Sequence, residues 1–379
     1  MSKRLVLFCI TCGVLALSAS AQDTSASDAG ASTGWLQCRQ FDQDPAARLA
    51  CFDRWVQQQK GPAPAQQPGA GPALAPTPAG PAAEPQQAAV SQPDCRDSKY
   101  STLSRFWELE PGSDCGRFNI RGYNPISLSW AVSDNVNTNP SSPTPGHTAN
   151  YTDYLRSEGR IQLSIRTKIG QGFLPVDHFG GRDSLWFGYT QQSYWQLFSS
   201  SLSRPFRITD HEPELIYIVP TVAELPLGWH LRYSGISLNH QSNGQPLPLS
   251  RSWNRVILMA GMEKDQRFTL TGRMWQRIPE DVESDDNPEI SDLVGRGEIS
   301  GSWKVNKDNT LAMTVRHSLR STANGSVRIE WLQTLGNDNR NQASGLRFHV
   351  QLFSGYGDSL LDYNFYRTVL NIGLSLVDW

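Results

Sequence analysis

The chain has 379 residues, which is enough for one large domain with additional segments, and its 34 Lys and Arg against 36 Asp and Glu give a formal net charge of −2. This balance offers no basic patch or stripe of the kind that nucleic-acid binding requires, so we expect no nucleic-acid partner. Beyond the first residues, no window holds 18 uninterrupted apolar residues, which excludes a transmembrane helix.

Residues 1–21 are predicted to be a signal peptide. Lys3 and Arg4 precede a short apolar run, and Ala19-Ser20-Ala21 forms an A-x-A cleavage site, so we expect the mature chain to begin at Gln22. A membrane anchor is the alternative, but the run is shorter than the ~20 apolar residues that span a bilayer. Cleavage leaves 32 basic against 36 acidic residues, a net charge of −4.

Four cysteines remain after cleavage: Cys38, Cys51, Cys95 and Cys115. An even number in an exported chain indicates disulfides, and three pairings are possible. We favour Cys38 with Cys51 and Cys95 with Cys115, because this pairing closes the shortest loops. A metal site is not expected from these residues, since they contain no C-x-x-C pair.

The N-terminal part divides by composition into two segments that precede the main domain, residues 93–379. Residues 22–55 are predicted to be a small disulfide-closed segment with a helical piece. Residues 56–92 are almost wholly Gln, Ala, Pro and Gly. Such a stretch cannot bury enough apolar surface to offset its chain entropy, so we expect a disordered linker.

From about Ser101 onward, apolar and polar residues alternate, which predicts strands with two different faces. In RIQLSIR (160–166), for example, isoleucine and leucine alternate with arginine, glutamine and serine, and the pattern recurs at 267–278, 346–352 and 370–376. We count about twelve candidate strands between Asn124 and Trp379. The fold class is therefore all-β.

Two architectures fit this alternation: a soluble β-sandwich, which buries its apolar face, and a membrane barrel, which turns that face toward lipid. The arginine- and glutamine-rich polar faces suit a hydrogen-bonded barrel interior, and aromatic residues near strand ends suit interfacial girdles. These aromatic residues are Trp186, Tyr189, Tyr194, Trp195, Trp229, Trp275 and Trp331. We therefore predict an antiparallel twelve-stranded transmembrane β-barrel, with the even strand number typical of bacterial outer membranes.

The candidate catalytic residues lie in SLNHQSNGQPLPLSRSWNR (237–255). His240 and Ser242 are two residues apart and share a strand face with the apolar Ile236 and Leu238. Asn254 likewise shares a face with the apolar residues of the next predicted strand. All three polar groups therefore lie on the lipid-facing side, and a hairpin would bring Asn254 beside His240.

A catalytic role explains why polar groups occupy a face where they are costly without partners. The His240 imidazole could take the Ser242 proton, and Asn254 could accept from the other ring nitrogen and fix the tautomer. A serine reached from the lipid side would attack an ester in the bilayer. The alternative without catalysis is a rim of polar residues where the strands lead into a loop. His317-Ser318 is a weaker candidate, because adjacent strand residues point to opposite faces.

NHQSNG (239–244) and SRSWNR (250–255) resemble the active-site signature of outer-membrane phospholipase A. The similarity covers about two-thirds of the chain, from Pro125 onward, with the motifs in the same order. It runs through YTQQSYWQL (189–197), PFR and EPEL (within 205–215), GW (228–229), DDNPEI (285–290) and SGYGDSLLDYNF (354–365). The resemblance implies a twelve-stranded barrel in the bacterial outer membrane. The N-terminal segment lies outside the similarity, and we expect it in the periplasm. The resemblance also implies a homodimer that hydrolyses acyl esters of membrane phospholipids with calcium, as phospholipase A1/A2 and lysophospholipase.

Carried over residue by residue, the resemblance assigns Ser242 as the nucleophile, His240 as the general base and Asn254 as the residue that orients His240. Gly244 matches the glycine whose backbone N–H helps to bind the oxyanion. A catalytically silent outer-membrane pore or adhesin is the alternative function.

The resemblance also implies calcium ligands: the Ser250 hydroxyl, the Gln245 backbone carbonyl and Ser203 of the partner subunit. Calcium prefers such oxygen ligands and can stabilise developing negative charge. Leu247 stands where the family has an acidic residue of a second calcium site, whose other carboxylate matches Asp286, so the second site is doubtful.

Gln191 matches a glutamine of the family's dimer interface. A contact inside the barrel is the alternative position for this side chain.

Overall fold

The structure of the protein is a computed structural model that describes residues 38, 44–59, 95–174, 182–336 and 345–376. The chain divides into two units, residues 1–86 and 87–379. The predicted signal peptide and most of the predicted linker lie outside the described residues. The described residues include no helix with the length and apolar character of a membrane-spanning helix.

The described part of the first unit is the helix α1 (Pro45–Gln59) and Cys38. Asp44 caps the helix, because its carboxylate accepts hydrogen bonds from the N–H groups of Ala46 and Ala47. A disulfide joins Cys38 to Cys51, in agreement with the favoured pairing. The helix continues to Gln59, four residues into the range predicted as linker.

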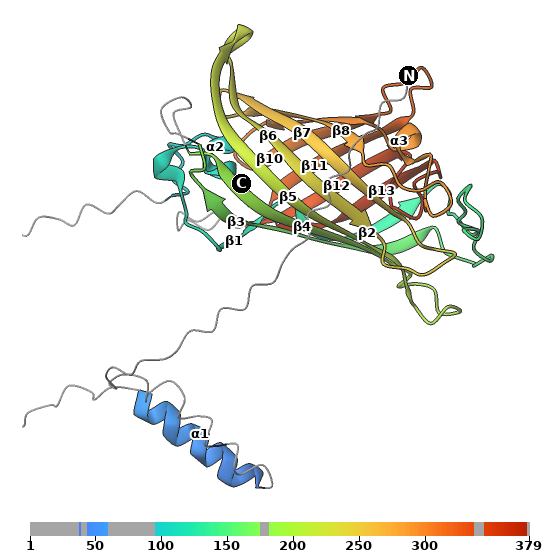
Figure 1. Cartoon of the computed structure of the whole chain (residues 1–379), viewed down its shortest axis with the longest axis horizontal. Coiled ribbons are helices and arrows are strands. Elements are labelled where there is room, and N and C mark those ends of the chain that lie inside the picture. The colour runs from blue at the N-terminus through green and yellow to red at the C-terminus, as the bar shows by residue number, and fades with distance from the viewer. Residues whose placement is uncertain (1–37, 39–43, 60–94, 175–181, 337–344, 377–379) are drawn as a thin grey trace, which may run out of the picture. The chain divides into compact units, whose positions relative to one another are not determined.

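Twelve strands of the second unit form a closed antiparallel barrel (Figure 1), which confirms the predicted fold. They are β2 (Ile126–Ser133), β3 (Ser157–Gln171), β4 (Ser184–Trp195), β5 (Phe206–Leu225), β6 (Trp229–Ser242), β7 (Ser252–Lys264), β8 (Phe268–Arg277), β9 (Gly297–Lys304), β10 (Asn309–His317), β11 (Gly325–Thr334), β12 (Leu346–Gly355) and β13 (Arg367–Leu376). Each strand pairs with its neighbours in sequence, and β13 pairs with β2 to close the ring. The short strand β1 (Ile120–Gly122) adds to β3.

The outward face of the barrel is apolar, as the alternation predicts. Leu238, Leu258 and Met274 are 54–61% exposed, whereas Ile257 and Trp275, which neighbour them in sequence, are buried. Comparable exposed rows occur around the ring and include Leu128, Leu163, Leu215, Ile299, Met313, Ile329, Leu352, Leu370 and Leu374. An apolar outward face with buried polar groups inside is the pattern of a lipid-facing barrel rather than a sandwich.

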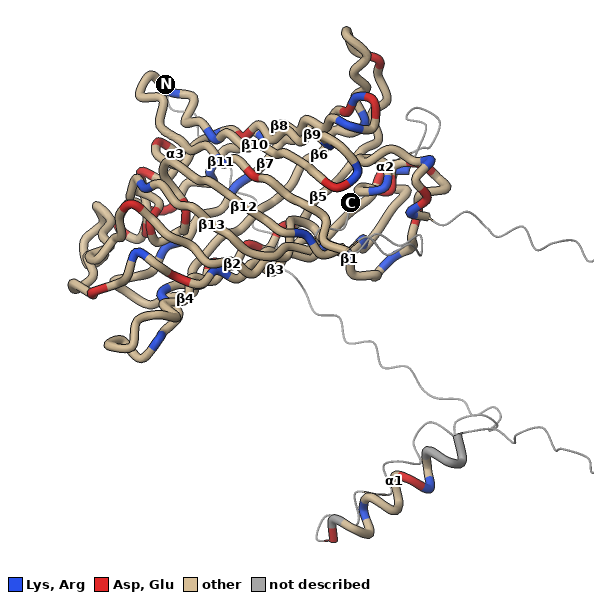
Figure 2. Tube along the Cα trace, turned by 180° about the vertical axis from the view of Figure 1, so that it is seen from behind, with Lys and Arg blue, Asp and Glu red and all other residues tan. Residues whose placement is uncertain are grey.

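Ion pairs fill much of the barrel interior, and charged residues occur along the strands as well as in the loops (Figure 2). Arg160 and Arg367 both lie 2.5 Å from Asp358, and Arg207 lies 2.8 Å from Asp362. None of these side chains is more than 5% exposed. Each of these buried charges has an opposite charge beside it, which is the condition under which buried charges are tolerated.

The prediction of an interfacial girdle is wrong for three of its aromatic residues. Trp186 and Tyr194 are fully buried and Trp275 is 7% exposed, because all three point into the barrel. Their neighbours take the outward positions, as Phe187 does beside Trp186. A residue's place near a strand end does not determine its face, whereas the two-residue phase does. The other four aromatic residues keep some exposure.

The helix α2 (Thr102–Trp107) lies at one end of the barrel and packs its apolar side into it (Figure 1). Trp107 meets Trp186 edge to face with ring centroids 5.6 Å apart. The Leu103 N–H donates to a carboxylate oxygen of Glu263 on β7. An aromatic contact therefore fills the interior of this end, which explains why Trp186 points inward.

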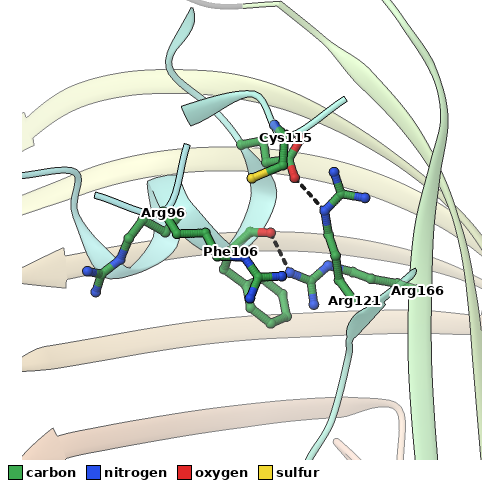
Figure 3. A pocket seen from close by; sticks show the side chains of 7 residues that line it. Arg96, Phe106, Cys115, Arg121 and Arg166 are labelled. Carbon is green, nitrogen blue, oxygen red and sulfur yellow. Dashed lines mark hydrogen bonds and ion pairs between the residues drawn. The ribbon is translucent and has the colours of Figure 1, made fainter. Parts of the chain in front are cut away.

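A second disulfide, Cys95–Cys115, closes the segment that carries α2 and also agrees with the favoured pairing. Beside it is a cavity of about 30 Å³, room for one water molecule. The Arg166 guanidinium donates to the Phe106 carbonyl at the edge of this cavity (Figure 3). The cavity is lined by Arg96, Arg105, Phe106, Glu108, Cys115, Arg121 and Arg166.

Asp114 makes the stability of this end depend on pH. Burial alone would raise the pKa of Asp114, but hydrogen bonds from Lys168, the Gly116 N–H and Gln171 lower it from 3.8 to about 2. A lowered carboxyl pKa stabilises the fold above the unfolded-state pKa, and this stabilisation is lost as pH falls through the folded-state pKa.

We therefore expect Asp114→Asn to lower the free energy of unfolding at pH 6 by about 1 kcal/mol, a modest value because solvent screens the partly exposed carboxylate. The difference from wild type should shrink as pH falls from about 4 to about 2. Denaturant unfolding in detergent at each pH measures it, with the exposed Asp153→Asn as the control. A difference that does not change with pH would contradict this explanation.

Candidate active site

His240 and Asn254 face each other across the β6–β7 hairpin, as predicted. They are direct cross-strand partners, and His240 Nδ1 lies 2.8 Å from Asn254 Oδ1. Both share the outward face with the exposed Leu238 and Leu258. Since an amide oxygen can only accept, Nδ1 donates the hydrogen bond and the lone pair of the ring remains on Nε2. This is the tautomer that a general base requires.

Ser242 lies two residues beyond His240 on the same outward face. Its cross-strand partners are Ser252 on β7 and His211 on β5. Among the described residues, the Ser242 hydroxyl makes no hydrogen bond to His240. Hydrogen bonds between a nucleophile and its base often tighten only when substrate binds. The structure therefore places Ser242 beside the His240–Asn254 pair, on the face that both occupy.

Gly244 lies in the loop 243–251, directly after β6, and is exposed with a φ of +61°. This left-handed conformation favours glycine, because a Cβ would strain the backbone. Asn243, which is 2% exposed, shapes the loop: its Oδ1 accepts from the N–H groups of Gln245 and Arg251, and its Nδ2 donates to the Leu249 carbonyl. We did not predict this role, although Asn before Gly is a known turn signal.

Oxygen atoms gather where this loop meets residues 285–287. The Ser250 hydroxyl donates to Asp286 at 2.7 Å, and the Ser252 hydroxyl donates to the same carboxylate oxygen at 3.3 Å. The other oxygen of Asp286 lies 2.9 Å from His147 Nε2. Asp286 therefore joins three segments that lie apart in the sequence.

The oxygens of this region suit a hard divalent cation such as calcium. Ser250 offers a hydroxyl, and the exposed loop offers the Gln245 backbone carbonyl. Within the described ranges, no group of three or more His, Cys, Asp and Glu is arranged to hold a metal ion, so hydroxyl and carbonyl oxygens would have to supply most ligands. Leu247 is exposed in the same loop and adds no oxygen from its side chain.

Ser203 lies apart from this loop in the sequence, in the turn between β4 and β5. It is exposed, and its φ of +60° holds a tight turn. An exposed backbone of this kind is accessible to another molecule.

Gln191 lies on the outward face of β4 and not inside the barrel. It pairs with the exposed Leu163 on β3 and with His211 on β5, and cross-strand partners share a face. Its amide nitrogen lies 3.3 Å from the Ser193 hydroxyl. An amide thus lies on the lipid-facing side, next to His211, which is the strand partner of Ser242.

His317 and Ser318, the weaker candidate pair, make contacts within the fold. Ser318 is fully buried, and its carbonyl accepts from the Arg296 guanidinium. The His317 Nδ1 accepts from the Leu319 N–H. Both residues are therefore engaged in holding the end of β10.

Comparisons with known proteins agree on one family. The family model for phospholipase A1 matches residues 103–376. A putative phospholipase A1 from Neisseria meningitidis is 35% identical over 285 residues, covering 74% of this chain and 71% of that protein. Phospholipase A1 from Escherichia coli K12 is 31% identical over 223 residues, covering 59% of this chain and 71% of that protein.

Two solved structures have the same fold. The outer membrane phospholipase (OMPLA) dimer of Salmonella typhi with bound calcium superposes with a TM-score of 0.59 at 27% identity, covering 70% of this chain and 94% of that chain. Outer membrane phospholipase A from Escherichia coli gives a TM-score of 0.59 at 27% identity, covering 68% and 94%.

Proposed function

We propose, since this chain belongs to the phospholipase A1 family of outer-membrane phospholipases, that it hydrolyses acyl esters of membrane phospholipids with Ser242, His240 and Asn254. The observation that carries the proposal is the His240–Asn254 hydrogen bond on the lipid-facing side of the barrel. The test is fatty-acid release from phospholipid–detergent micelles by the wild-type protein and by Ser242→Ala.

The residues have distinct roles in the proposed reaction. His240 Nε2 takes the proton of the Ser242 hydroxyl as its oxygen attacks the ester carbonyl, and returns that proton to the leaving alcohol. Asn254 holds the imidazole in the required orientation and tautomer. The Gly244 N–H donates to the oxyanion. Water then attacks the acyl ester of Ser242 with His240 again as the base, and the fatty acid is released.

The location of these residues supports a substrate in the membrane. Ile236 and Leu238 precede His240 on the same exposed face, so acyl chains can lie against apolar side chains while the ester reaches Ser242. Ser242, His240 and Asn254 could act in the same way on either acyl ester of a diacyl lipid and on the one remaining ester of a lysophospholipid. We therefore include phospholipase A1, phospholipase A2 and lysophospholipase activity in the proposal.

Calcium is the proposed cofactor, with Ser250, Gln245 through its backbone carbonyl, and Ser203 of the partner subunit as ligands. The Ser250 hydroxyl lies beside the Asp286 carboxylate, and this grouping of oxygen atoms supports the proposal. A bound calcium ion would supply positive charge that polarises the ester carbonyl. The leucine at position 247 supports one site between two subunits rather than an additional site within each monomer.

The proposed active form is a homodimer in the outer membrane whose N-terminal segment lies in the periplasm. A two-fold interface presents the same patch of both subunits, and an amide there can form hydrogen bonds across it. Gln191 is such an amide, because it lies on the lipid-facing side near Ser242.

Gln191→Ala is expected to raise the dimer dissociation constant about 3- to 10-fold, which corresponds to the energy of hydrogen bonds between membrane-embedded segments. Sedimentation equilibrium in detergent with calcium measures this constant. Gln276→Ala, which removes an exposed glutamine from β8, is the matched control. Equal dissociation constants for the two variants would show that Gln191 does not contribute to the dimer interface.

We favour hydrolysis over a silent pore or adhesin. The interior ion pairs and the aromatic cluster beneath α2 occupy space that a pore would leave open to water. In addition, a pore has no use for the His240–Asn254 hydrogen bond on its outer surface.

A further inference from the structure

Glu280 lies in the chain that leaves β8 and approaches Asn254 from the side opposite to His240. Its Oε1 is 3.3 Å from Asn254 Nδ2, so it accepts a hydrogen bond from the amide. The same chain is fixed to the Asn254 backbone, because the Ile278 N–H donates to the Asn254 carbonyl at 2.8 Å. Asn254 is therefore held through both its backbone and its side chain.

The carboxylate of Glu280 has its own support. Its Oε2 lies 3.4 Å from the Arg277 guanidinium, which also binds both oxygens of Asp285, at 2.6 and 2.8 Å. Burial raises the pKa of Glu280, and the positive charge of Arg277 opposes this rise. The contact with Arg277 therefore positions Glu280 and favours its ionised form.

The chemistry of the three groups determines the direction of each hydrogen bond. An ionised carboxylate only accepts, so the amide nitrogen of Asn254 must face Glu280. The amide oxygen must then face His240, and the imidazole must donate from Nδ1. The lone pair of Nε2 is left available for the Ser242 proton. Without an acceptor at Glu280, the amide could rotate by 180° and offer its N–H to His240.

We propose that Glu280 is a positioning residue of the hydrolytic site, which orients the Asn254 amide and through it selects the tautomer of His240. The inference rests on the proposed function, because the tautomer of His240 affects the reaction only if His240 acts as the general base. It also explains why an amide occupies position 254: a carboxylate there would face the Glu280 carboxylate, and the two like charges would repel each other.

The first test compares Glu280→Ala with Glu280→Gln. Glu280→Ala is expected to lower kcat about 10-fold or more with KM changed less than about twofold, because orientation is lost while substrate binding is kept. Glu280→Gln keeps an acceptor oxygen and should remain within about threefold of wild type. Glu283→Ala, an exposed glutamate of the same loop, should match wild type. Wild-type kcat in Glu280→Ala would overturn the proposal.

The second test uses charge. Asn254→Asp should lower kcat at least 100-fold when Glu280 is present, since two carboxylates then adjoin. Adding Glu280→Gln should recover about 10-fold or more of that loss, because the glutamine amide can donate to the introduced carboxylate. A purely structural role for Glu280 would instead make the double variant equal to or worse than Asn254→Asp, and this result would also overturn the proposal.

A measurement without turnover separates this inference from the proposed function. The ¹⁵N chemical shifts of His240 in detergent-solubilised protein report which ring nitrogen carries the proton. Wild type and Glu280→Gln should show the proton on Nδ1, and Glu280→Ala a mixture of tautomers. Unchanged shifts in Glu280→Ala would refute the role of Glu280 even if hydrolysis is confirmed. Absence of hydrolysis with the expected shifts would refute the function alone.

Discussion

Ser242→Ala is expected to lower kcat for phospholipid hydrolysis by about 10⁴-fold or more, because the substitution removes the oxygen that attacks the ester. KM should change little, since the apolar outward face that holds acyl chains stays intact. Fatty-acid release from phospholipid micelles in detergent and calcium measures both constants. Residual activity would reflect the oxyanion groups and substrate binding alone.

Ser234→Ala is the matched control for this experiment. Ser234 lies on β6, as Ser242 does, and donates to or accepts from Thr221 far from His240. Eight residues of strand separate the two serines by roughly 26 Å. Ser234→Ala should keep wild-type activity, and a similar loss in both variants would point to damage of the barrel instead of removal of a nucleophile.

Removing calcium with a selective chelator is expected to lower activity at least about 100-fold, and adding calcium back should restore it, because oxyanion stabilisation of this kind is worth about 10²–10³ in kcat. Magnesium should restore less, since it demands a smaller octahedral site and dehydrates reluctantly. Titration of activity against free calcium measures the effect in the wild-type protein.

Ser250→Ala tests whether the Ser250 hydroxyl is a calcium ligand. The variant loses one oxygen ligand, so the free calcium for half-maximal activity should rise about 10-fold or more, while saturating calcium should recover part of the rate. Ser252→Ala is its control, because that hydroxyl also donates to Asp286 but is not a proposed ligand. Full wild-type activity in chelator would refute the cofactor proposal.

The alternation of side chains made most of the fold predictable. A period of two assigned Leu238 and His240 to one face before any contact was known, and the barrel follows from the number of such strands. The same rule would have placed Trp186 inside, since Phe187 beside it is outward. We instead judged the aromatic residues by their closeness to strand ends, which carries no information about the face.

Part of the candidate site was also accessible from sequence, because a hairpin between two predicted strands brings Asn254 opposite His240. The roles of Asn243 and Glu280 were not predicted from the sequence. Asn243 acts through hydrogen bonds inside an irregular loop, and Glu280 reaches Asn254 from a segment 26 positions later. No periodicity relates these residues, so only the folded chain shows which polar groups meet.

The most direct test of the central claim is covalent labelling by a long-chain alkylsulfonyl fluoride, followed by mass spectrometry of the labelled peptide. The sulfonyl group should join the Ser242 oxygen with loss of fluoride, because His240 activates this hydroxyl on the lipid-facing side. Labelling should fall at least 100-fold in His240→Ala and stay at the wild-type rate in Ser234→Ala. A label on another residue, or equal labelling of Ser242 in His240→Ala, would contradict the proposed active site.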